Sequence, residues 1–289
     1  MDDADTPALF RLGIVAEDDD FDRVSGLLAL HAAFGWEEES LPGGETRFTV
    51  HCESEEHLLR LQDRLRATAP RADTTLERVE RQDWLAAWRQ FFTPVMCGSR
   101  FVVLPPWLAE GGDFADRTPI IIEPKSAFGT GHHATTALCL RVLSELLDSG
   151  RVAPGGHFLD LGTGSGVLGI ACARSGLSGL GLDIDPLAVS NARENRELNR
   201  TDAAVFEVAE GGVEQAAGRR FDLVLANILA RPLMEMAAPL AAARAADGCL
   251  VLSGLLERQA DAVEAAYRAQ GLPSARRVVD GEWCALVWA

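Results

Sequence analysis

The spacing of apolar residues follows two different periods along the chain. Over residues 1–80, short apolar or alternating runs at 9–15, 46–51 and 74–79 are typical of strands, and the Pro-Gly-Gly turn at 42–44 would join the second run to a further strand before it. Two stretches with helical spacing lie between these runs, the first after an acidic turn and the second after Ser54. The apolar residues that are expected to share a helix face are Phe21, Val24, Leu27, Leu28 and Leu30 in the first stretch, and Leu58, Leu61 and Leu65 in the second. The order strand, helix, strand, strand, helix, strand predicts a small α+β domain of ferredoxin-like type.

Residues 81–98 are expected to connect this domain to the rest of the chain, beginning with a helix. Trp84, Leu85, Trp88 and Phe92 recur at helical spacing. We interpret the tryptophans as packing between domains, because this is a more common role for such a stripe than ligand stacking.

From residue 134 onward, helical stretches alternate with short apolar runs. This alternation is typical of a parallel sheet covered by helices on both faces, so we predict an α/β domain over residues 99–289. Strands are expected at 157–161, 179–183, 221–226 and 249–253, helices at 135–147, 167–176, 186–199, 231–245 and 257–270, a terminal strand pair at 276–279 and 283–288, and two earlier strands at 100–106 and 119–123.

The composition excludes several classes of protein. Hydrophobic residues make up 47% and charged residues 24% of the chain, which is too apolar for a disordered protein. The six cysteines include no CxxC pair, which argues against a zinc ribbon, a thioredoxin motif and a dense disulfide framework. No apolar run reaches the roughly 18 residues of a membrane span, and the N-terminus lacks the pattern of a signal peptide. We therefore expect a cytoplasmic protein that does not bind membranes, and we expect it to be a monomer.

Acidic residues are concentrated in the first quarter of the chain. The whole chain has 43 Asp+Glu against 27 Lys+Arg and a net charge of −16. Residues 1–80 alone hold 19 acidic residues and 8 arginines, a net charge of −11. Such a surface repels a phosphate backbone, so direct nucleic-acid binding is not expected, and it would attract a basic partner. A surface that serves only solubility explains the charge as well.

A glycine-rich stretch at 160–166, Asp-Leu-Gly-Thr-Gly-Ser-Gly, follows a predicted strand and opens a helix. Glycines at such a turn let the backbone approach a ligand, and the free amides of the helix start favour an anion. The spacing is GxGxG, which differs from the GxGxxG of dinucleotide sites. The next strand ends in Asp183, where a carboxylate could accept hydrogen bonds from ribose hydroxyls. Together these features favour S-adenosylmethionine over NAD, although a tight turn alone would also explain the glycines.

Two further segments could carry chemistry. Residues 123–136 contain two glycines around Thr130, two adjacent histidines, and two threonines where a helix begins. The histidines have no further ligands at zinc spacing, so we expect no metal site. Asn227 ends a buried strand at the sheet edge where α/β proteins bind ligands. Its side-chain carbonyl could orient an attacking amine, or it could simply close the strand in a turn.

Several of these strings, spread over most of the chain, resemble the ribosomal protein L11 methyltransferase (PrmA) family. The matching strings are AFGTG-HH-ATT at 127–136, DLGTGSG at 160–166, GLDIDPLAV at 181–189, ANILA at 226–230, LSGLLERQ at 252–259 and GEWC at 281–284. The first and fourth are specific to the family, whereas the glycine loop marks only the wider methyltransferase superfamily. The chain departs from the family at Lys125, His132, Ala134 and Thr163; the last three changes are expected to be tolerated in a loop lined by backbone.

The resemblance implies a fold, a reaction and a set of site residues. The fold would be a Rossmann-like class I methyltransferase domain over 99–289, preceded by a ferredoxin-like substrate-recognition domain over 1–80. The reaction would be methyl transfer from S-adenosylmethionine to lysine side-chain and N-terminal amines of a basic ribosomal protein, L11. Carried over by motif, the cofactor-binding residues would be Thr136, Gly162, Gly164, Asp183 and Asn227. Of these, Asn227 would also be the catalytic residue.

Other functions remain open from the sequence. The chain could methylate another basic protein or a nucleic-acid amine, and the net charge weighs against the latter. An NAD-dependent oxidoreductase is disfavoured by the spacing of the glycines. A non-catalytic ribosome-assembly module is disfavoured by the intact glycine loop, Asp183 and Asn227.

Overall fold

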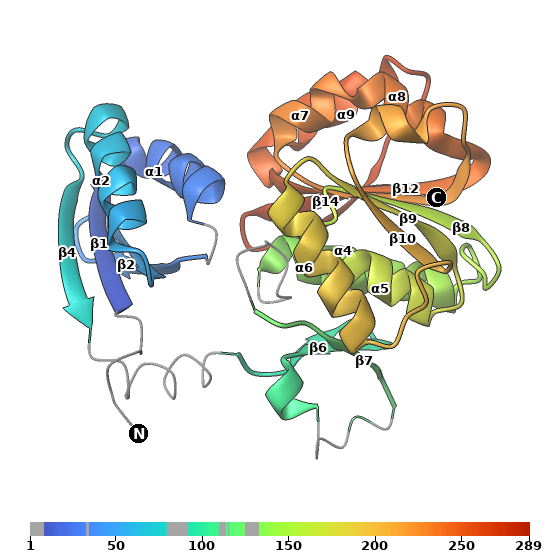
Figure 1. The fold of residues 1–289 in the computed structure, drawn as a ribbon. Coiled ribbons are helices and arrows are strands. Elements are labelled where there is room, and N and C mark those ends of the chain that lie inside the picture. Colours follow the sequence, from blue (N-terminus) through green and yellow to red (C-terminus); the bar gives the residue numbers. More distant parts are fainter. Residues whose placement is uncertain (1–8, 33–34, 80–91, 110–113, 115, 125–132) are drawn as a thin grey trace, which may run out of the picture. The chain divides into compact units, whose positions relative to one another are not determined.

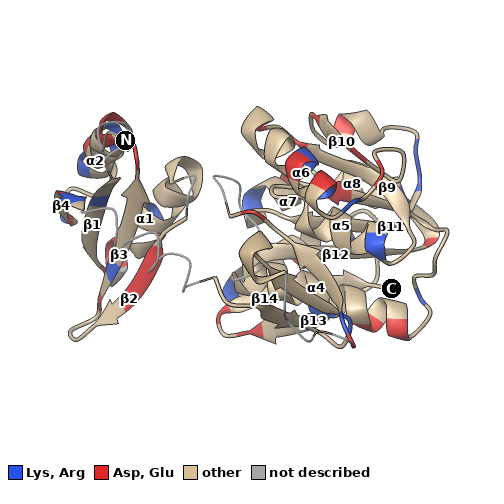
Figure 2. Cartoon of the chain, turned by 60° about the horizontal axis from the view of Figure 1, so that its bottom comes forward, with Lys and Arg blue, Asp and Glu red and all other residues tan. Residues whose placement is uncertain are grey.

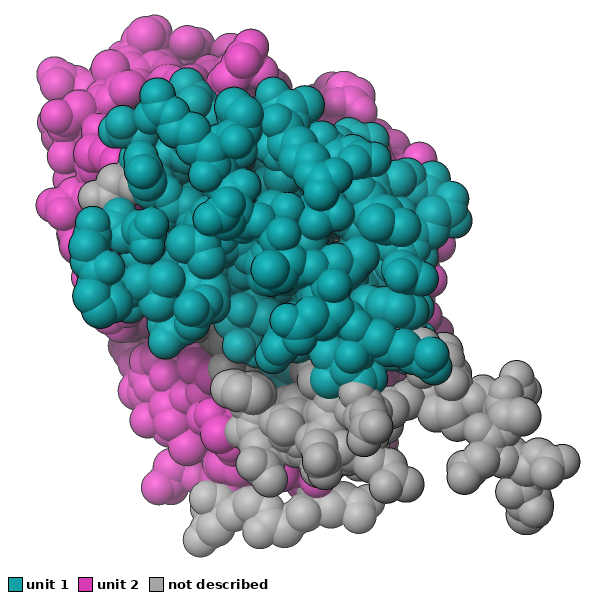
Figure 3. All heavy atoms as spheres, turned by 90° about the vertical axis from the view of Figure 1, so that its left-hand side faces the viewer, with its two compact units in different colours: residues 1–92 teal, residues 93–289 magenta. Residues whose placement is uncertain are grey.

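The structure, a computed structural model, describes residues 9–32, 35–79, 92–109, 114, 116–124 and 133–289. The chain divides into two compact units, residues 1–92 and 93–289, which Figure 3 colours separately. The predicted connecting helix with Trp84 and Trp88 lies outside the described residues. The same is true of Lys125 and of the segment 127–132.

The described residues of the first unit form four strands and two helices in the predicted order (Figure 1). Their bounds are β1 Leu9–Glu17, α1 Asp18–His31, β2 Glu37–Leu41, β3 Glu45–Cys52, α2 Glu55–Thr68 and β4 Asp73–Val79. The antiparallel sheet has the strand order β2-β3-β1-β4. Two consecutive βαβ halves with the first and third strands in the middle are the ferredoxin-like arrangement, so this prediction is confirmed.

Side chains of alternating strand residues form the core of the first unit. Leu12 and Ile14 of β1 and Phe48 and Val50 of β3 are at most 1% exposed, and the leucines of α2 pack against them. The residues between them point to the other face of the sheet, as the period of a strand requires. Helix α2 begins where expected, because the Ser54 hydroxyl accepts a hydrogen bond from the His57 amide at 3.2 Å.

The second unit is built on a sheet of seven strands in the order β10-β9-β8-β11-β12-β14-β13. Strands β8 to β12 are parallel to one another, whereas β14 runs antiparallel to both β12 and β13. The bounds are α4 Ala134–Asp148, β8 His157–Leu161, α5 Val167–Arg174, β9 Ser178–Asp183, α6 Pro186–Leu198, β10 Phe206–Glu210, β11 Phe221–Asn227, α7 Ala230–Glu235, α8 Ala237–Ala243, β12 Arg244–Leu256, α9 Ala260–Arg268, β13 Arg276–Asp280 and β14 Trp283–Trp288. This is the Rossmann-like methyltransferase arrangement that the resemblance implies. The predicted terminal strand pair adds one antiparallel strand, β14, to the otherwise parallel sheet.

Helices cover both faces of this sheet (Figure 1). Alternate strand residues such as Phe158 and Leu223 face the core shared with α4, α5 and α6. Their neighbours Leu159 and Val224 face the core shared with α7, α8 and α9. All six cysteines are buried and unpaired: Cys52 in the first unit, and Cys97, Cys139, Cys172, Cys249 and Cys284 in the second. Within the described ranges, no helix is both long and apolar enough to cross a membrane.

Four details differ from the sequence prediction. Leu30 does not share the apolar face of α1, because it is 71% exposed. Strand β10 was not predicted. The predicted helix at 231–245 is two short helices that meet at Met236, and its last residues belong to β12. Residues Val95–Cys97, which were assigned to the connecting segment, form strand β5 and pair with Phe101–Leu104.

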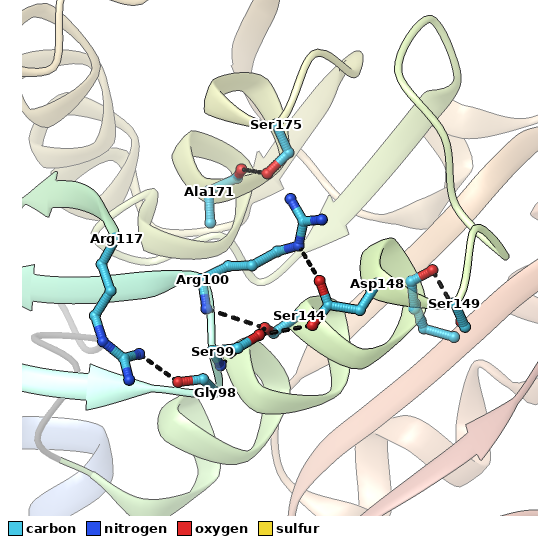
Figure 4. A network of polar contacts seen from close by, with 10 residues as sticks. Gly98, Ser99, Arg100, Arg117, Ser144, Asp148, Ser149, Ala171 and Ser175 are labelled. Atoms are coloured by element: carbon cyan, nitrogen blue, oxygen red, sulfur yellow. Dashed lines mark hydrogen bonds and ion pairs between the residues drawn. The ribbon is translucent and has the colours of Figure 1, made fainter. Parts of the chain in front are cut away.

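A separate three-stranded sheet, β5-β6-β7, packs beside α4. Strand β6 is Phe101–Leu104 and β7 is Thr118–Ile121. Figure 4 shows how the turn before β6 is fixed to the end of α4: the Ser144 hydroxyl accepts from the Ser99 and Arg100 amides at 3.1 and 3.2 Å. The Arg100 guanidinium and the Ser99 hydroxyl both donate to Asp148 at 2.6 Å, and together they lower the pKa of that carboxyl. The small sheet is therefore anchored to the same helix that carries Thr136 at its other end.

Candidate active site

The predicted site residues lie at the carboxyl edge of the large sheet. Strand β8 lies in the middle, with β9 on one side and β11 on the other. The chain runs from β8 to β9 and β10 in one direction and then returns to β11 and β12 in the other. Ligands of open α/β sheets bind at this switch point, outside the carboxyl ends of the strands.

The glycine loop between β8 and α5 needs its glycines for backbone conformation. Gly162, Gly164 and Gly166 have φ values of 71°, 54° and 83°, which residues with a side chain rarely adopt. The Gly162 and Thr163 amides both donate to the Leu182 carbonyl, at 2.8 and 3.0 Å. These bonds hold the loop beside the end of β9.

Asp183, which the sequence analysis expects to bind ribose hydroxyls, ties the loop to the next strand. Its Oδ2 accepts a hydrogen bond from the Gly164 amide at 2.9 Å, and its Oδ1 accepts from the Asp185 amide at 3.0 Å. An ionised carboxylate has lone pairs for further donors, and this one is only partly buried. Two apolar side chains near it are exposed, Ile184 at 80% and Leu187 at 63%.

Thr136 and Asn227, which are 91 residues apart in the sequence, are brought together. The Asn227 Nδ2 group donates to the Thr136 hydroxyl at 3.3 Å. This bond fixes the amide plane and turns the side-chain oxygen of Asn227 the other way. That oxygen is buried and has no hydrogen-bond partner among the described residues. A buried acceptor without a donor is costly, so it is expected to receive one from a ligand.

The residue after Asn227 connects the Asn227–Thr136 pair with the glycine loop. Ile228 follows Asn227 and lies over Gly162, where an added Cβ would overlap its Cγ2 methyl group. On its other side, a Cβ at Gly254 would overlap the Ile228 backbone. The two glycines, both with positive φ, therefore leave just enough space for this residue. The loop after β11 and the glycine loop are interlocked.

Sequence reasoning gave no role to Asp160, the last polar residue of β8. Its carboxyl is fully buried; Oδ2 accepts from the Thr163 hydroxyl at 2.7 Å and from the Gly169 amide at 3.0 Å. Burial raises the pKa of Asp160 to about 6. Thr163, a departure from the family pattern, thus has a defined bond in this chain. The signal was present in the sequence, because an acidic residue inside an apolar strand requires a partner.

His133 caps α4 next to Thr136. Its Nδ1 accepts from the Thr135 amide at 3.3 Å, and burial lowers its pKa, so the ring is neutral at neutral pH. The ring packs edge-on against Trp283 of β14, with centroids 4.7 Å apart. Trp283 belongs to the GEWC string, which places the last strand of the chain beside this site. The described residues contain no group of three His, Cys, Asp or Glu side chains that could hold a metal ion.

The model of one family, ribosomal protein L11 methyltransferase (PrmA), matches residues 21–289 of the chain. The chain belongs to the PrmA family. A curated member from Geobacter sulfurreducens is 43% identical over 222 residues, covering 76% of this chain and 70% of that protein. One from Pelotomaculum thermopropionicum is 41% identical over 221 residues, covering 75% and 68%. Both are called ribosomal protein L11 methyltransferase.

A solved structure agrees with this assignment to the PrmA family. The crystal structure of a ribosomal protein L11 methylase from Lactobacillus delbrueckii subsp. bulgaricus superposes with a TM-score of 0.61 at 27% sequence identity. The match covers 68% of this chain and 97% of that one. The family assignment therefore rests on both sequence and fold.

Proposed function

We propose that this chain transfers methyl groups from S-adenosylmethionine to lysine side-chain and N-terminal amines of ribosomal protein L11. Family membership supports the reaction class and the substrate, since the relatives carry that name. The observation that carries the proposal for this chain is the buried, unpartnered oxygen of Asn227 beside the glycine loop.

The residues at the sheet edge suit S-adenosylmethionine. Asp183 retains lone pairs for ribose hydroxyls, and the exposed side chains of Ile184 and Leu187 offer apolar surface to an adenine ring. The positive-φ glycines bring the backbone close to a ligand, and the first amides of α5 favour its carboxylate. When bound, the cofactor would supply an electrophilic methyl group on a sulfonium centre.

Asn227 is proposed to orient the attacking amine. Its oxygen can accept a hydrogen bond from an amine N–H and thereby aim the nitrogen lone pair, while Thr136 holds its amide in place. A lysine amine has a reference pKa of about 10.4 and has no lone pair while it is protonated. The side chains next to Asn227, those of Thr136 and Ile228, carry no charge. Such surroundings favour the neutral amine by desolvation.

The first unit is proposed to recruit the basic substrate. Figure 2 shows acidic residues over most of β2, an edge strand in which Glu37, Glu38 and Glu39 are all exposed. Charge of this kind acts mainly on the rate of association and is screened by salt. We further propose that the chain acts as a monomer and without direct nucleic-acid binding.

The test compares Asn227→Ala with Ser253→Ala. These residues are paired in register on neighbouring strands, and the Ser253 hydroxyl donates to the Cys284 carbonyl at 3.4 Å. With purified L11 and labelled S-adenosylmethionine, the wild type should methylate L11 amines. Asn227→Ala should lower kcat on the order of 100-fold with a smaller change in substrate binding. Ser253→Ala should stay within a few-fold of the wild type.

Two results would contradict the proposal. A wild type that binds S-adenosylmethionine but leaves L11 unmethylated would refute the substrate. Full turnover of Asn227→Ala at saturating cofactor and L11 would refute the role of that residue and leave the reaction standing.

A further inference from the structure

Three asparagines form a buried column along helix α6. Asn191, Asn195 and Asn199 are spaced four residues apart, which places them on one side of the helix, and they are at most 3% exposed. The Asn195 Nδ2 group donates to the Asn191 oxygen at 2.9 Å, and the Asn199 Nδ2 group donates to the Asn195 carbonyl at 2.8 Å. Buried amides are costly unless they are hydrogen-bonded, so a column of three indicates specific partners.

Asn199, at the C-terminal end of the column, is hydrogen-bonded to the small sheet β5-β6-β7. The Asn199 oxygen accepts from the Ile121 amide at 2.9 Å, and its Nδ2 donates to the Ile121 carbonyl at 2.6 Å. Asn199 therefore pairs with the last residue of β7 much as a neighbouring strand would. Its bonds do not reach the glycine loop.

Asn195 joins three elements. Its Oδ1 accepts from the Glu123 amide at 2.9 Å, just beyond β7, and its Nδ2 donates to the Ser165 carbonyl at 2.8 Å. Ser165 is part of the glycine loop and is itself buried. One side chain of α6 thus holds both the loop and the segment that follows β7.

The bond to Ser165 sets the direction of a loop peptide. The peptide after Ser165 presents its carbonyl to Asn195, and its Gly166 amide donates to the Thr163 carbonyl at 2.8 Å. Two residues earlier in the loop, the Gly164 amide donates to Asp183. The glycine loop is therefore held from two sides, by the carboxylate at the end of β9 and by the amide of Asn195.

We propose that Asn195 is a positioning residue for cofactor binding, which acts by fixing the glycine loop through the Ser165 carbonyl. The inference rests on the proposed use of S-adenosylmethionine. Asn195 does not need to touch the cofactor. Its loss should let the loop peptide reorient, so that the backbone facing the cofactor is no longer preorganised.

Asn199 provides a matched control. Each residue makes three side-chain hydrogen bonds within the described part of the chain, both are buried, and they lie one turn apart. Asn195→Ala and Asn199→Ala should therefore destabilise the full chain by similar amounts. In calorimetric titration, Asn195→Ala should raise the Kd for S-adenosylmethionine about tenfold, as for the loss of one buried hydrogen bond. Asn199→Ala should raise it less than about threefold, and kcat at saturating cofactor should stay near the wild-type value for both.

Asn195→Asp gives a readout that a general loss of stability does not. The new carboxyl can still accept from the Glu123 amide, but it can donate to the Ser165 carbonyl only when it is protonated. Burial raises the pKa of such a group. The Kd of this variant for S-adenosylmethionine should therefore approach the wild-type value as the pH falls from about 8 to about 5.

The outcomes separate the inference from the proposed function. Equal Kd values for Asn195→Ala and Asn199→Ala would overturn the inference. If Asn195→Ala does not fold, a Kd of Asn195→Asp that follows the pH dependence of the wild type would overturn it instead. A wild type that does not bind S-adenosylmethionine would show that the proposed function has failed, whatever the variants do.

Discussion

Replacing Gly162 by alanine should be unusually destabilising, and the structure says why. The residue has a φ of 71°, which costs an alanine about 1–2 kcal/mol. The new methyl group would also overlap the Ile228 Cγ2 atom, well inside the 3.5–4.0 Å of an ordinary carbon contact. Ile228 has a stiff branched side chain, and its backbone is held against Gly254, so it cannot easily move away. Overpacking of this kind adds roughly 1–3 kcal/mol, for a total of about 2–5 kcal/mol.

The two contributions separate in a double-mutant cycle. In an Ile228→Ala background the Cγ2 atom is gone and the remaining Cβ lies at an ordinary 3.8 Å, so Gly162→Ala should cost only the conformational part, about 1–2 kcal/mol. Gly166→Ala is the control. It also has a positive φ, but its Cβ would meet Ala192 at 3.2 Å, so the Ile228 background should not change its cost.

Hydrogen exchange at the amides of β8 and β11, measured by mass spectrometry in the full chain, reports the free energy of opening of this region. If Gly162→Ala costs the same free energy in both backgrounds, overlap with the Ile228 side chain is not the cause of the destabilisation. The same conclusion follows if the Ile228→Ala background lowers the free-energy cost of Gly166→Ala as much as it lowers that of Gly162→Ala.

Two further predictions concern charge. Burial raises the pKa of Asp160 from 3.8 to about 6, so its contribution to stability is complete below pH 3.8 and is lost as the pH rises through about 6. Asp160→Asn should thus stabilise the chain by roughly 3 kcal/mol more at about pH 7.5 than at about pH 3.5; a pH-independent difference in denaturant titrations would contradict this. Glu37→Gln with Glu38→Gln should lower kcat/KM for L11 several-fold at low salt and less at high salt. The exposed pair Glu197→Gln with Glu207→Gln is its control, and equal losses would remove β2 from recruitment.

Most of the fold can be predicted from the spacing of apolar residues, and the elements that were predicted wrongly or missed have physical explanations. Strand β10 has the sequence Phe-Glu-Val-Ala-Glu and is an edge strand, so it lacks the continuous apolar run of its neighbours. Its Phe206 ring packs where Gly169 and Gly181 have no side chain, a fit that only the folded state shows. The predicted helix at 231–245 breaks at Met236. Pro239 explains the break, because in a continuous helix its ring would clash with the carbonyl four residues earlier.

The positions of the candidate site residues could be predicted where a residue type has a characteristic chemistry. The glycine loop, Asp183 and Asn227 stand at strand ends, and the sheet order brings them to one edge. The resemblance assigns both Asn227 and Thr136 to the cofactor, but the bond between them is seen only in the structure, because nothing local links residues so far apart. The asparagines of α6 were missed, although amides repeated every fourth residue along a buried helix face are a readable signal. What they bind depends on β7 and the glycine loop, which pack against α6 only in the fold.

The burial of all six cysteines has a practical consequence. Burial raises the pKa of each thiol, to about 11 for Cys97 and about 12 for Cys139, so none presents a thiolate to a reagent in the folded chain. Maleimide or spin labels should therefore attach only to cysteines introduced on the surface, for example at Asp63 of α2 and Glu207 of β10, which are both exposed. No native thiol needs to be removed. A doubly labelled chain can then report the distance between the two units, and how ribosomal protein L11 changes it, with both native cores intact.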